Sequence, residues 1–537
     1  MAFNIADLFE HVVDAVPDRT ALIVGDRRLT YRELDERANR LAHHLAAAGI
    51  GKNDHVGIYG FNSTEFVETM LASYKLRAVP INVNYRYVEE ELRYLFDNAD
   101  LVALVVERQF VPRVAAVRDE LPLLRHVVVV DDGSGEDLAA VSGVDYDEAQ
   151  AAASPERNFE SRSDDDIYIL YTGGTTGMPK GVIWRHEDVF RTLGGGINFQ
   201  TGERVPHERF LAEQAAASAG PGVTLATAPL MHGAAQWGTF NGIFNGNSVV
   251  LMRKFDPHEV WRLVEKEKVN TVTMTGDAMA RPMIEAFPDV NPDTSSLVAL
   301  SSTAAVFSKS VKEQYLDLLP NVIITDAVGS TETGFSGVTM VQKGAEQRGG
   351  GPTVSIGPDT IVLDADDKPV EPGSGVVGRI ARAGNVPIGY YKDPEKTAAT
   401  FVMVDGKRYA IPGDFATVEA DGTMTLLGRG SVCINSGGEK IYPEEVEGAL
   451  KSHPKVFDAI VVGVADERWG QKVVAVVQPR PGEPPTLDEL DQHCRTHIAG
   501  YKVPKGLHVV EQIQRQPSGK PDYPWAKSVA EKALAGA

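Results

Sequence analysis

A run rich in glycine and threonine, with a lysine near its end, carries the clearest chemical signal in the sequence. Residues 171–181 read YTGGTTGMPKG and directly follow the apolar segment IYIL, which is typical of a strand. Glycines let backbone N–H groups approach a polyanion, threonine hydroxyls add donors, and Lys180 adds positive charge. The run therefore predicts a phosphate-binding loop rather than a solvated hairpin. It is not a Walker A loop, because Lys180 lies between Pro179 and Gly181, so ordinary P-loop ATPases are disfavoured.

Shorter motifs occur before and after this run. They are LTYREL at 29–34, PLMHG at 229–233, GSTE at 329–332, IGYY at 388–391, PGD at 412–414, GR at 428–429, SGGE at 436–439 and PSGK at 517–520. In this order they closely resemble the signature motifs of the adenylate-forming superfamily, which includes acyl-CoA synthetases, luciferases and the adenylation domains of peptide synthetases. The resemblance extends over nearly the whole chain, and chance does not produce so many matches in order.

The resemblance implies a CoA ligase that activates a carboxylic acid with ATP and releases AMP and pyrophosphate. In the first step a carboxylate attacks the α-phosphate of ATP, so the site must supply positive charge where two anions meet. The resemblance gives this role to Lys520 and to Mg²⁺, with Glu332 as the metal ligand and Thr331 holding the phosphate. It also implies that His232 lies beside the carboxylate, at the mouth of a tunnel for the acyl group.

An ATP site drawn from several segments is also implied by the resemblance. Asp414 would accept hydrogen bonds from both ribose hydroxyls, with Arg429 reinforcing them. The full set of implied ATP-binding residues is Thr172, Gly173, Gly174, Thr175, Thr176, Gly177, Lys180, Thr303, Ala304, Ala305, Asp326, Ala327, Val328, Gly329, Ser330, Asp414 and Arg429. Two of them depart from the family pattern, which usually has Ser at Gly173 and an aromatic residue at Val328. The resemblance implies that adenine lies against Thr303, Ala304 and Ala305, and that Asp326, Ala327 and Val328 flank the base. Weaker stacking on adenine is the expected consequence of Val328.

The second step, transfer of the acyl group to the thiol of coenzyme A, needs a different arrangement of the chain. The thiol must reach the acyl carbonyl, but the lysine needed for the first step blocks its approach. Members of the superfamily rotate the C-terminal domain, which withdraws the lysine and presents a glycine-containing loop to CoA. In this sequence that loop corresponds to Gly437, Gly438 and Glu439. The rotation is expected about residues 428–431, where Ser431 replaces an acidic or lysine hinge residue.

The class of acid is indicated by further sequence segments and by an acyl pocket implied at His232, Gly233 and Trp237. The segments are WRHEDVFRTLGGG at 184–196, TGDAMARP at 275–282, SSTAAVFS at 301–308 and INSGGEKIYPEEVE at 434–447. They resemble actinobacterial CoA ligases that act on steroid side-chain acids and related bulky or long-chain acids. Small residues surround Trp237 without an Asp or Lys, so an apolar acid is favoured. The segment 196–224 either covers the tunnel or joins a subunit contact.

Composition and charge disfavour several other classes of protein. The 537 residues include 53 Lys and Arg against 74 Asp and Glu, and the net charge of -21 repels nucleic acid. Two cysteines, Cys433 and Cys494, are too few for a disulfide framework. No apolar run is long enough to span a bilayer and no signal peptide is evident, so we expect a cytoplasmic enzyme without an integral membrane segment. The expected partner is its small-molecule acid. The sequence leaves open whether the protein forms a homo-oligomer.

Alternating strands and amphipathic helices must position these motifs. The alternation runs from residue 55 to residue 130 and again from 247 to 326, with helix starts near Asp256, Asp277 and Ser308. It predicts an α/β fold with doubly wound parallel sheets, in which ligands bind beyond the carboxyl ends of the strands. Residues 353–427 predict a small β subdomain, and the Ala/Gly-rich segment 212–222 predicts a loop.

Three parts of the chain follow from these patterns. Residues 1–427 are predicted to form the N-terminal adenylation domain with the ATP and acyl pockets. Residues 428–431 are the predicted hinge, and residues 432–537 a small mobile α+β domain that carries the catalytic lysine. Two other functions stay open on the sequence alone. An acyl-AMP ligase would load a carrier protein, and a nucleotide-binding regulator would use the domain rotation without turnover.

Overall fold

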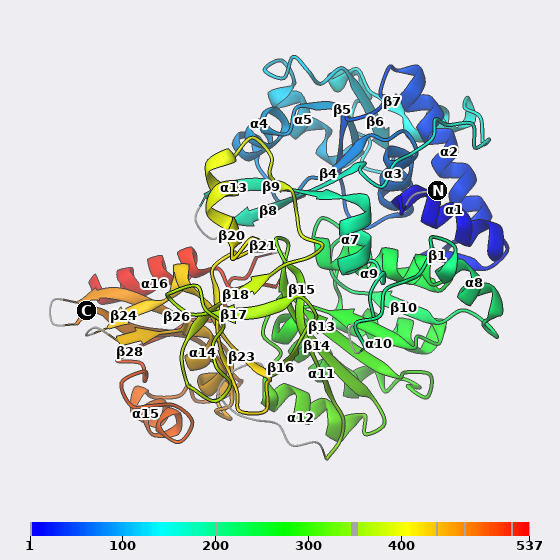
Figure 1. The fold of residues 1–537 in the computed structure, drawn as a ribbon. Helices are drawn as coiled ribbons and strands as arrows, with labels where there is room; N and C mark the ends of the chain where they lie inside the picture. Colours follow the sequence, from blue (N-terminus) through cyan, green and yellow to red (C-terminus); the bar gives the residue numbers. More distant parts are fainter. Residues whose placement is uncertain are drawn as a thin grey trace. The chain divides into compact units, whose positions relative to one another are not determined.

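The structure, a computed structural model, describes residues 3–174, 177–198, 201–344, 353–436, 439–466, 469–516 and 519–535. The chain folds into two compact units (Figure 1). The first comprises Met1–Thr273, Val290–Leu297 and Gly384–Phe401, and the second comprises Met274–Asp289, Val298–Ala383 and Val402–Ala537. Of the helices in the described ranges, none is both long and apolar enough to cross a bilayer.

A five-stranded parallel sheet in the first unit confirms the predicted alternation. Its strands are β3 (His55–Tyr59), β4 (Val79–Asn82), β5 (Leu101–Glu107), β6 (His126–Val130) and β7 (Val144–Asp145). They lie in the order β4-β3-β5-β6-β7, and every pairing is parallel. The connections contain α3 (Thr64–Lys75), α4 (Glu89–Asn98), η1 (Arg108–Phe110), α5 (Val111–Arg118) and η2 (Leu138–Val141), and α6 (Tyr146–Ala151) follows β7.

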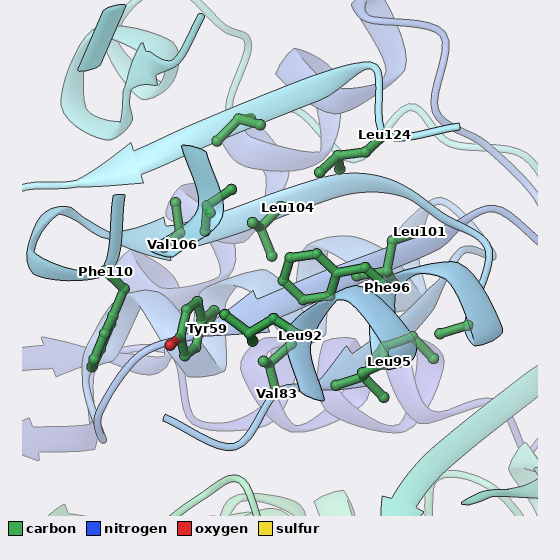
Figure 2. Close-up of a cluster of buried hydrophobic side chains, with 14 of the residues drawn as sticks. Tyr59, Val83, Leu92, Leu95, Phe96, Leu101, Leu104, Val106, Phe110 and Leu124 are labelled. Carbon is green, nitrogen blue, oxygen red and sulfur yellow. The ribbon is translucent and has the colours of Figure 1, made fainter. Parts of the chain in front are cut away.

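The core of this sheet shows why these residues form these elements. Every residue of β5 is buried, as expected for a central parallel strand covered on both faces. Leu92, Leu95 and Phe96 form the buried stripe of α4. Figure 2 shows these side chains in one cluster with Tyr59 of β3 and Leu104 of β5. The apolar stripe thus holds α4 against the sheet.

A second sheet of the first unit is parallel except for one hairpin. Its strands are β1 (Thr20–Val24), β2 (Arg27–Thr30), β10 (Val223–Ala226), β11 (Ser248–Leu251) and β12 (Thr271–Met274), in the order β2-β1-β11-β10-β12. Its helices are α1 (Ile5–Ala15), α2 (Tyr31–Ala47), α9 (Gly233–Phe244) and α10 (Pro257–Glu267). The LTYREL motif starts α2, where Thr30 and Glu33 form a capping box. Asp256 caps α10 as predicted.

Two local predictions in the first unit were wrong. The segment 212–222 is not all loop, because α8 (Phe210–Ala217) occupies its first half and contacts α1. Alanine is the strongest helix former, and the glycines that suggested a loop follow the helix. The strand predicted at IYIL is present, but it continues into the glycine- and threonine-rich run, which was expected to be a loop. The run lies within an antiparallel pair, β8 (Ile167–Gly174) and β9 (Gly177–Arg185), whose sheet is completed by β19 (Gly389–Tyr390) and flanked by α7 (His186–Leu193) and α13 (Pro394–Thr400).

The second unit begins with a sheet that changes from parallel to antiparallel. Its first strands are β13 (Ala299–Thr303), β14 (Ile323–Ser330), β15 (Gly334–Val341), β16 (Thr353–Ile356) and β17 (Thr360–Leu363). They are followed by β18 (Gly378–Arg382), β20 (Phe401–Val404), β21 (Lys407–Ala410), β22 (Asp414–Val418) and β23 (Met424–Arg429). The strands lie in the order β13-β14-β15-β16-β23-β22-β18-β21-β20, and β17 pairs with β18. The helices of this part of the second unit are α11 (Gly276–Val290) and α12 (Lys309–Leu318). β13 and β14 are parallel, whereas β16 to β18 and β20 to β23 lie in the predicted β subdomain. The predicted range 353–427 was too wide, because Gly384–Phe401, which includes β19, belongs to the first unit.

The last hundred residues of the second unit have the predicted α+β architecture. Their strands are β24 (Ile434–Ser436), β25 (Glu439–Ile441), β26 (Val456–Asp466), β27 (Gly470–Pro479) and β28 (Gly506–Val509), after the 3-10 turn η3 (Gly430–Val432). The helices are α14 (Pro443–Lys451), α15 (Leu487–Arg495) and α16 (Tyr523–Ala535). One apolar cluster contains residues of α14 and α15, and a second cluster contains residues of α16. The predicted domain boundary at 428–431 stays a prediction, because residues 402–537 belong to one compact unit.

A buried charge network ties α1 to α2 and α3 in the first unit. Lys75, whose side chain is fully buried, donates to Glu10 Oε1 at 2.5 Å and to Asp35 Oδ1 at 2.7 Å. Arg162 also donates to Glu10 Oε1, at 2.9 Å. Burial alone raises the pKa of Glu10, but the charges of Lys75 and Arg162 outweigh it and lower that pKa from 4.5 to about 2.

We expect Glu10→Gln to remove stability that depends on pH. Because folding lowers the pKa of Glu10, its contribution is complete above pH 4.5 and is lost as the pH falls toward 2. The two pKa values correspond to at most about 3 kcal/mol at neutral pH. Thermal denaturation at pH 7 and pH 3.5 should show the Tm difference from wild type narrowing at the lower pH. Asp18→Asn, which removes an exposed carboxylate paired with Arg32, is the control. A Glu10→Gln difference that is equal at both pH values would contradict the assignment.

Candidate functional site

Lys520 lies in the second unit with three other charged residues predicted for the nucleotide site. The surrounding protein lowers the pKa of its ammonium group by desolvation, and the Arg429 charge lowers it further. Glu332 and Asp414 act in the opposite direction, because their negative charges favour the protonated lysine. The Lys520 residue is exposed to solvent. The structure thus brings Lys520, Glu332, Asp414 and Arg429 close enough for their charges to interact.

Asp414 and Arg429 face each other across two strands. They are opposite partners in the β22–β23 ladder, and Arg429 Nε donates to Asp414 Oδ1 at 3.1 Å. Gly428, which precedes Arg429, has φ +120, and a Cβ there would lie 2.1 Å from Glu444 Oε2 at the start of α14. Glycine is favoured here, because this φ strains any residue with a Cβ and the Cβ would also displace the Glu444 carboxylate. The GR motif therefore combines a charged residue with a backbone position that must be small.

Thr331 and Glu332 lie in a tight turn between β14 and β15. Ser330 N donates to Thr333 Oγ1 at 3.1 Å, and Thr333 N donates to Ser330 Oγ at 3.2 Å. A Cβ on Gly329 would lie 2.0 Å from Gly334 O, so the strands meet too closely for any other residue. Glu332 is 9% exposed. Sequence reasoning missed Thr333, although a serine followed three residues later by a threonine is a recognisable turn signal.

The two segments predicted to flank adenine lie side by side. Thr303 at the end of β13 is the parallel partner of Ala327 in β14, and Ala305 follows shortly after. Ala304 has φ +68, a left-handed conformation that costs energy for any residue with a Cβ. Val328 packs against the apolar core of the β subdomain.

Asp326 has a buried partner that sequence reasoning also missed. Lys312 Nζ on α12 donates to Asp326 Oδ2 at 2.6 Å, and both side chains are less than 10% exposed. Desolvation raises the pKa of Asp326, and the Lys312 charge offsets only part of this rise. The pair fixes the position of the Asp326 carboxylate in β14.

The phosphate-binding run belongs to the first unit. In its hairpin Thr172 is opposite Lys180, and Gly174 is opposite Gly177. Lys180 forms an ion pair with Asp393, and this hydrogen bond is the main cause of the lowered pKa of Asp393. Asp393 also caps α13. Sequence reasoning missed this acidic partner of the loop lysine.

Some residues of the predicted segments lie outside the described residues. They are Thr175 and Thr176 of the phosphate-binding run, Phe199 and Gln200 of the segment 196–224, Gly437 and Gly438 of the predicted CoA loop, and Pro517 and Ser518 of the PSGK motif. Glu439 is described: it is exposed, and it pairs with Ser436 between β24 and β25.

The predicted acyl pocket is connected to the phosphate-binding run through Asn82, which the sequence did not single out. The buried Asn82 Nδ2 donates to Tyr171 O at 2.8 Å and to Met231 O at 2.7 Å, and Tyr171 N donates to Asn82 Oδ1 at 2.8 Å. Met231 precedes His232, which occupies the N-cap position of α9. Asn82 therefore holds the start of the run and the start of α9 at a fixed separation.

The other two residues of the predicted acyl pocket pack closely with β8. A Cβ on Gly233 would lie 2.5 Å from Leu170 Cδ2. The Leu170 side chain therefore leaves no room for a larger residue at position 233. Trp237 is 3% exposed, and its ring makes an edge contact with Tyr168 at 5.4 Å between ring centroids. These contacts give the surroundings of α9 an apolar character.

Glu332 fits the role of a magnesium ligand. Mg²⁺ takes hard oxygen ligands and usually keeps substrate phosphates and waters in its coordination shell. Within the described residues, no group of three or more His, Cys, Asp or Glu side chains is placed to hold a metal ion. A magnesium ion here would therefore depend on ATP phosphates as well as on Glu332.

Comparisons with known proteins find related enzymes over nearly the whole chain. The family model described as AMP-binding enzyme matches residues 9–391, and the model described as AMP-binding enzyme C-terminal domain matches residues 445–520. A Rhodococcus rhodochrous protein named 3-oxocholest-4-en-26-oate--CoA ligase is 58% identical over 533 residues, which cover 98% of this chain and 96% of that protein. A Mycolicibacterium smegmatis protein named medium/long-chain-fatty-acid--CoA/3-oxocholest-4-en-26-oate--CoA ligase is 57% identical, with coverage of 99% and 97%.

A solved structure shares the whole fold. An anthranilate CoA ligase in complex with anthranoyl-AMP superposes with a TM-score of 0.85 at 24% identity. The superposition covers 99% of this chain and 98% of that chain. At this identity the likeness concerns the fold alone, and it confirms the predicted fold class.

We expect Asn82→Ala to lower both thermal stability and ATP affinity. The variant leaves the buried Tyr171 N–H without its acceptor, which costs about 1–3 kcal/mol, and it releases the start of the phosphate-binding run. Thermal denaturation and calorimetric titration with ATP measure the two effects. Asn98→Ala is the matched control, because it removes only the 2.8 Å hydrogen bond from the Tyr171 hydroxyl. Wild-type ATP affinity in Asn82→Ala would show that the run does not depend on this contact.

Proposed function

The chain belongs to the family of AMP-binding enzymes, and we propose that it is an AMP-forming acyl-CoA synthetase for an apolar carboxylic acid. The observation that carries this proposal is identity of 58% and 57%, over nearly full length, to proteins named as CoA ligases. The carboxylate of the acid attacks the α-phosphate of ATP, which forms an acyl-adenylate and releases pyrophosphate. The CoA thiol then attacks the acyl carbonyl, which forms the thioester and releases AMP.

The charged residues of the second unit support a role in the first step. Lys520 is held near Asp414 and Arg429, so its ammonium group can neutralise charge that develops on the α-phosphate while those two residues bind the ribose. A magnesium ion bound through Glu332 would supply further positive charge to the phosphates. Thr331 and the run from Thr172 to Lys180 would bind the phosphates through hydroxyl and backbone N–H groups.

The second step is proposed to use the CoA loop Gly437, Gly438 and Glu439 after rotation about residues 428–431. A cytoplasmic location fits an enzyme that consumes ATP and CoA. The acyl-AMP ligase and the regulator are less favoured, because the two relatives are named as CoA ligases.

The proposed substrates are 3-oxocholest-4-en-26-oate and medium- or long-chain fatty acids, the acids in the names of the two relatives. The packed apolar surroundings of Trp237 support an apolar acid, and His232 would lie near its carboxylate.

A substrate panel tests the proposed function directly. Purified protein with ATP, Mg²⁺ and CoA should convert 3-oxocholest-4-en-26-oate and C8 to C18 fatty acids to thioesters, with equal amounts of AMP and acyl-CoA by mass spectrometry. Benzoate, a small aromatic acid, is the control and should give neither product. AMP without thioester would favour a carrier-protein acceptor, and the absence of AMP with every acid would overturn the proposal.

Lys520→Ala should slow formation of the acyl-adenylate by about a hundredfold or more, because one charge contact to the transition state is worth roughly 3 kcal/mol. ATP binding should change little, and the variant should still convert synthetic acyl-AMP and CoA to acyl-CoA. Pyrophosphate release and thioester formation measure the two steps separately. Lys505→Ala, which changes an exposed lysine of the same segment, should behave as wild type. Unchanged adenylation in Lys520→Ala would remove the lysine from the mechanism.

A further inference from the structure

The turn that carries Lys520 is closed by its own backbone. Gln516 N donates to Lys520 O at 2.9 Å, and Gly519 N donates to Gln516 O at 2.8 Å. Arg515 and Pro521 form a β-bridge at the base of the turn. These bonds close the turn on either side of Pro517 and Ser518, which lie outside the described residues. They do not fix the position of the turn relative to the rest of the domain. That position requires a contact between the turn and a residue outside it.

Arg515 supplies that contact with three donors. Its Nη1 donates to Gly519 O at 3.0 Å, and the Gly519 carbonyl carbon is bonded directly to the Lys520 nitrogen. Its Nε and Nη2 donate to the two carboxylate oxygens of Asp458, at 2.7 Å and 2.6 Å. One planar guanidinium group therefore joins the backbone beside the lysine to a side chain elsewhere in the domain.

Asp458 is a rigid anchor. It lies near the start of β26, which pairs with β27 from Val456 to Asp466. The Asp458 side chain is 9% exposed and that of Arg515 is 14% exposed, so solvent screens their attraction only weakly. Burial alone raises the pKa of Asp458, but the Arg515 charge and hydrogen bonds outweigh it and lower that pKa. The pair is ionised and held by the central strands of the domain.

The turn has little freedom on its other side. A Cβ built on Gly519, whose φ is +78, would lie 2.8 Å from Thr275 Oγ1 and 3.1 Å from Ala278 Cβ. Gly519 therefore lies directly against the start of α11, and a shift toward that helix would create a clash. Arg515 holds the turn on one side while α11 limits it on the other.

We propose that Arg515 and Asp458 form a positioning pair that fixes the Lys520 turn in the pose needed to form the acyl-adenylate. The proposal rests on the proposed role of Lys520. A lysine in place of Arg515 keeps the charge but lacks the planar fork that reaches Asp458 and Gly519 together. The pair contacts neither the acid nor CoA in this proposal, so the second step does not depend on it.

The test measures the two half-reactions separately in Arg515→Lys and Asp458→Asn. Each variant should slow pyrophosphate release from ATP and a fatty acid roughly 10- to 100-fold in kcat, since small misplacement of a catalytic group has effects of this size. The KM for ATP should stay within about threefold, and conversion of synthetic acyl-AMP and CoA should stay within about twofold, by the same reasoning on geometry. The double variant should be no slower than the slower single variant, because both changes break one unit.

Arg495→Lys is the matched control. Arg495 also makes a two-point contact with an aspartate, Asp491, but this pair is exposed on α15. It should leave both half-reactions unchanged. Wild-type adenylation in both Arg515→Lys and Asp458→Asn would overturn the positioning role, as would equal losses in the two half-reactions, which indicate general destabilisation. If wild type itself forms no acyl-adenylate with any acid, the proposed function fails instead.

Discussion

The carboxylate of the acid and the triphosphate of ATP repel each other, and this repulsion determines what the site must contain. The second unit gathers Lys520 and Arg429 with Glu332 and Asp414 in one partly desolvated place. Charges interact more strongly there than in bulk water, and each fixed charge also alters its neighbours. Because Asp414 and Glu332 balance the two cations, Lys520 can remain near Arg429 before any nucleotide is bound. The balance makes the exact placement of each side chain important.

Such placement relies on unusually close approaches to the backbone. A Cβ on Gly428 would lie 2.1 Å from the Glu444 carboxylate, and a Cβ on Gly329 would lie 2.0 Å from the Gly334 carbonyl oxygen, both far shorter than a van der Waals contact. These glycines belong to the GR and GSTE motifs, so the motifs describe geometry as much as chemistry. Ala304 also has a backbone conformation that favours glycine, with φ +68, although its side chain carries a Cβ. Strain at a predicted adenine contact is consistent with a backbone shaped for binding.

The sequence predicted the elements well where local patterns decide structure. The β5 run is buried throughout, and the Asp256 cap marks the start of α10, because burial and capping leave periodic or positional signals. The partners of the site residues leave no such signal. Lys180 and Asp393 are 213 positions apart, and Arg515 and Asp458 are 57 positions apart.

A single arginine or aspartate in a sequence is usually a solvated surface residue. Only the fold reveals that these particular charges meet. Asn82 is a further example, because its three backbone contacts join segments that the chain order keeps far apart.

The strengths of the contacts around Lys520 fit a lysine that must act in one step and leave in the next. Within the C-terminal segment, the Arg515–Asp458 contacts are 2.6 Å and 2.7 Å long and two-pointed. Toward α11 the polar contacts are longer: Arg480 Nη1 lies 3.0 Å from Glu285 Oε1 in a partly exposed pair, Arg281 Nη2 lies 3.3 Å from Lys451 O, and Lys451 Nζ lies 3.8 Å from Asp277 Oδ2. Longer contacts are weaker and cost less to break. The proposed rotation would therefore separate the C-terminal segment from α11 while the Lys520 turn stays fixed to β26, so the lysine returns in the same orientation for the next acid.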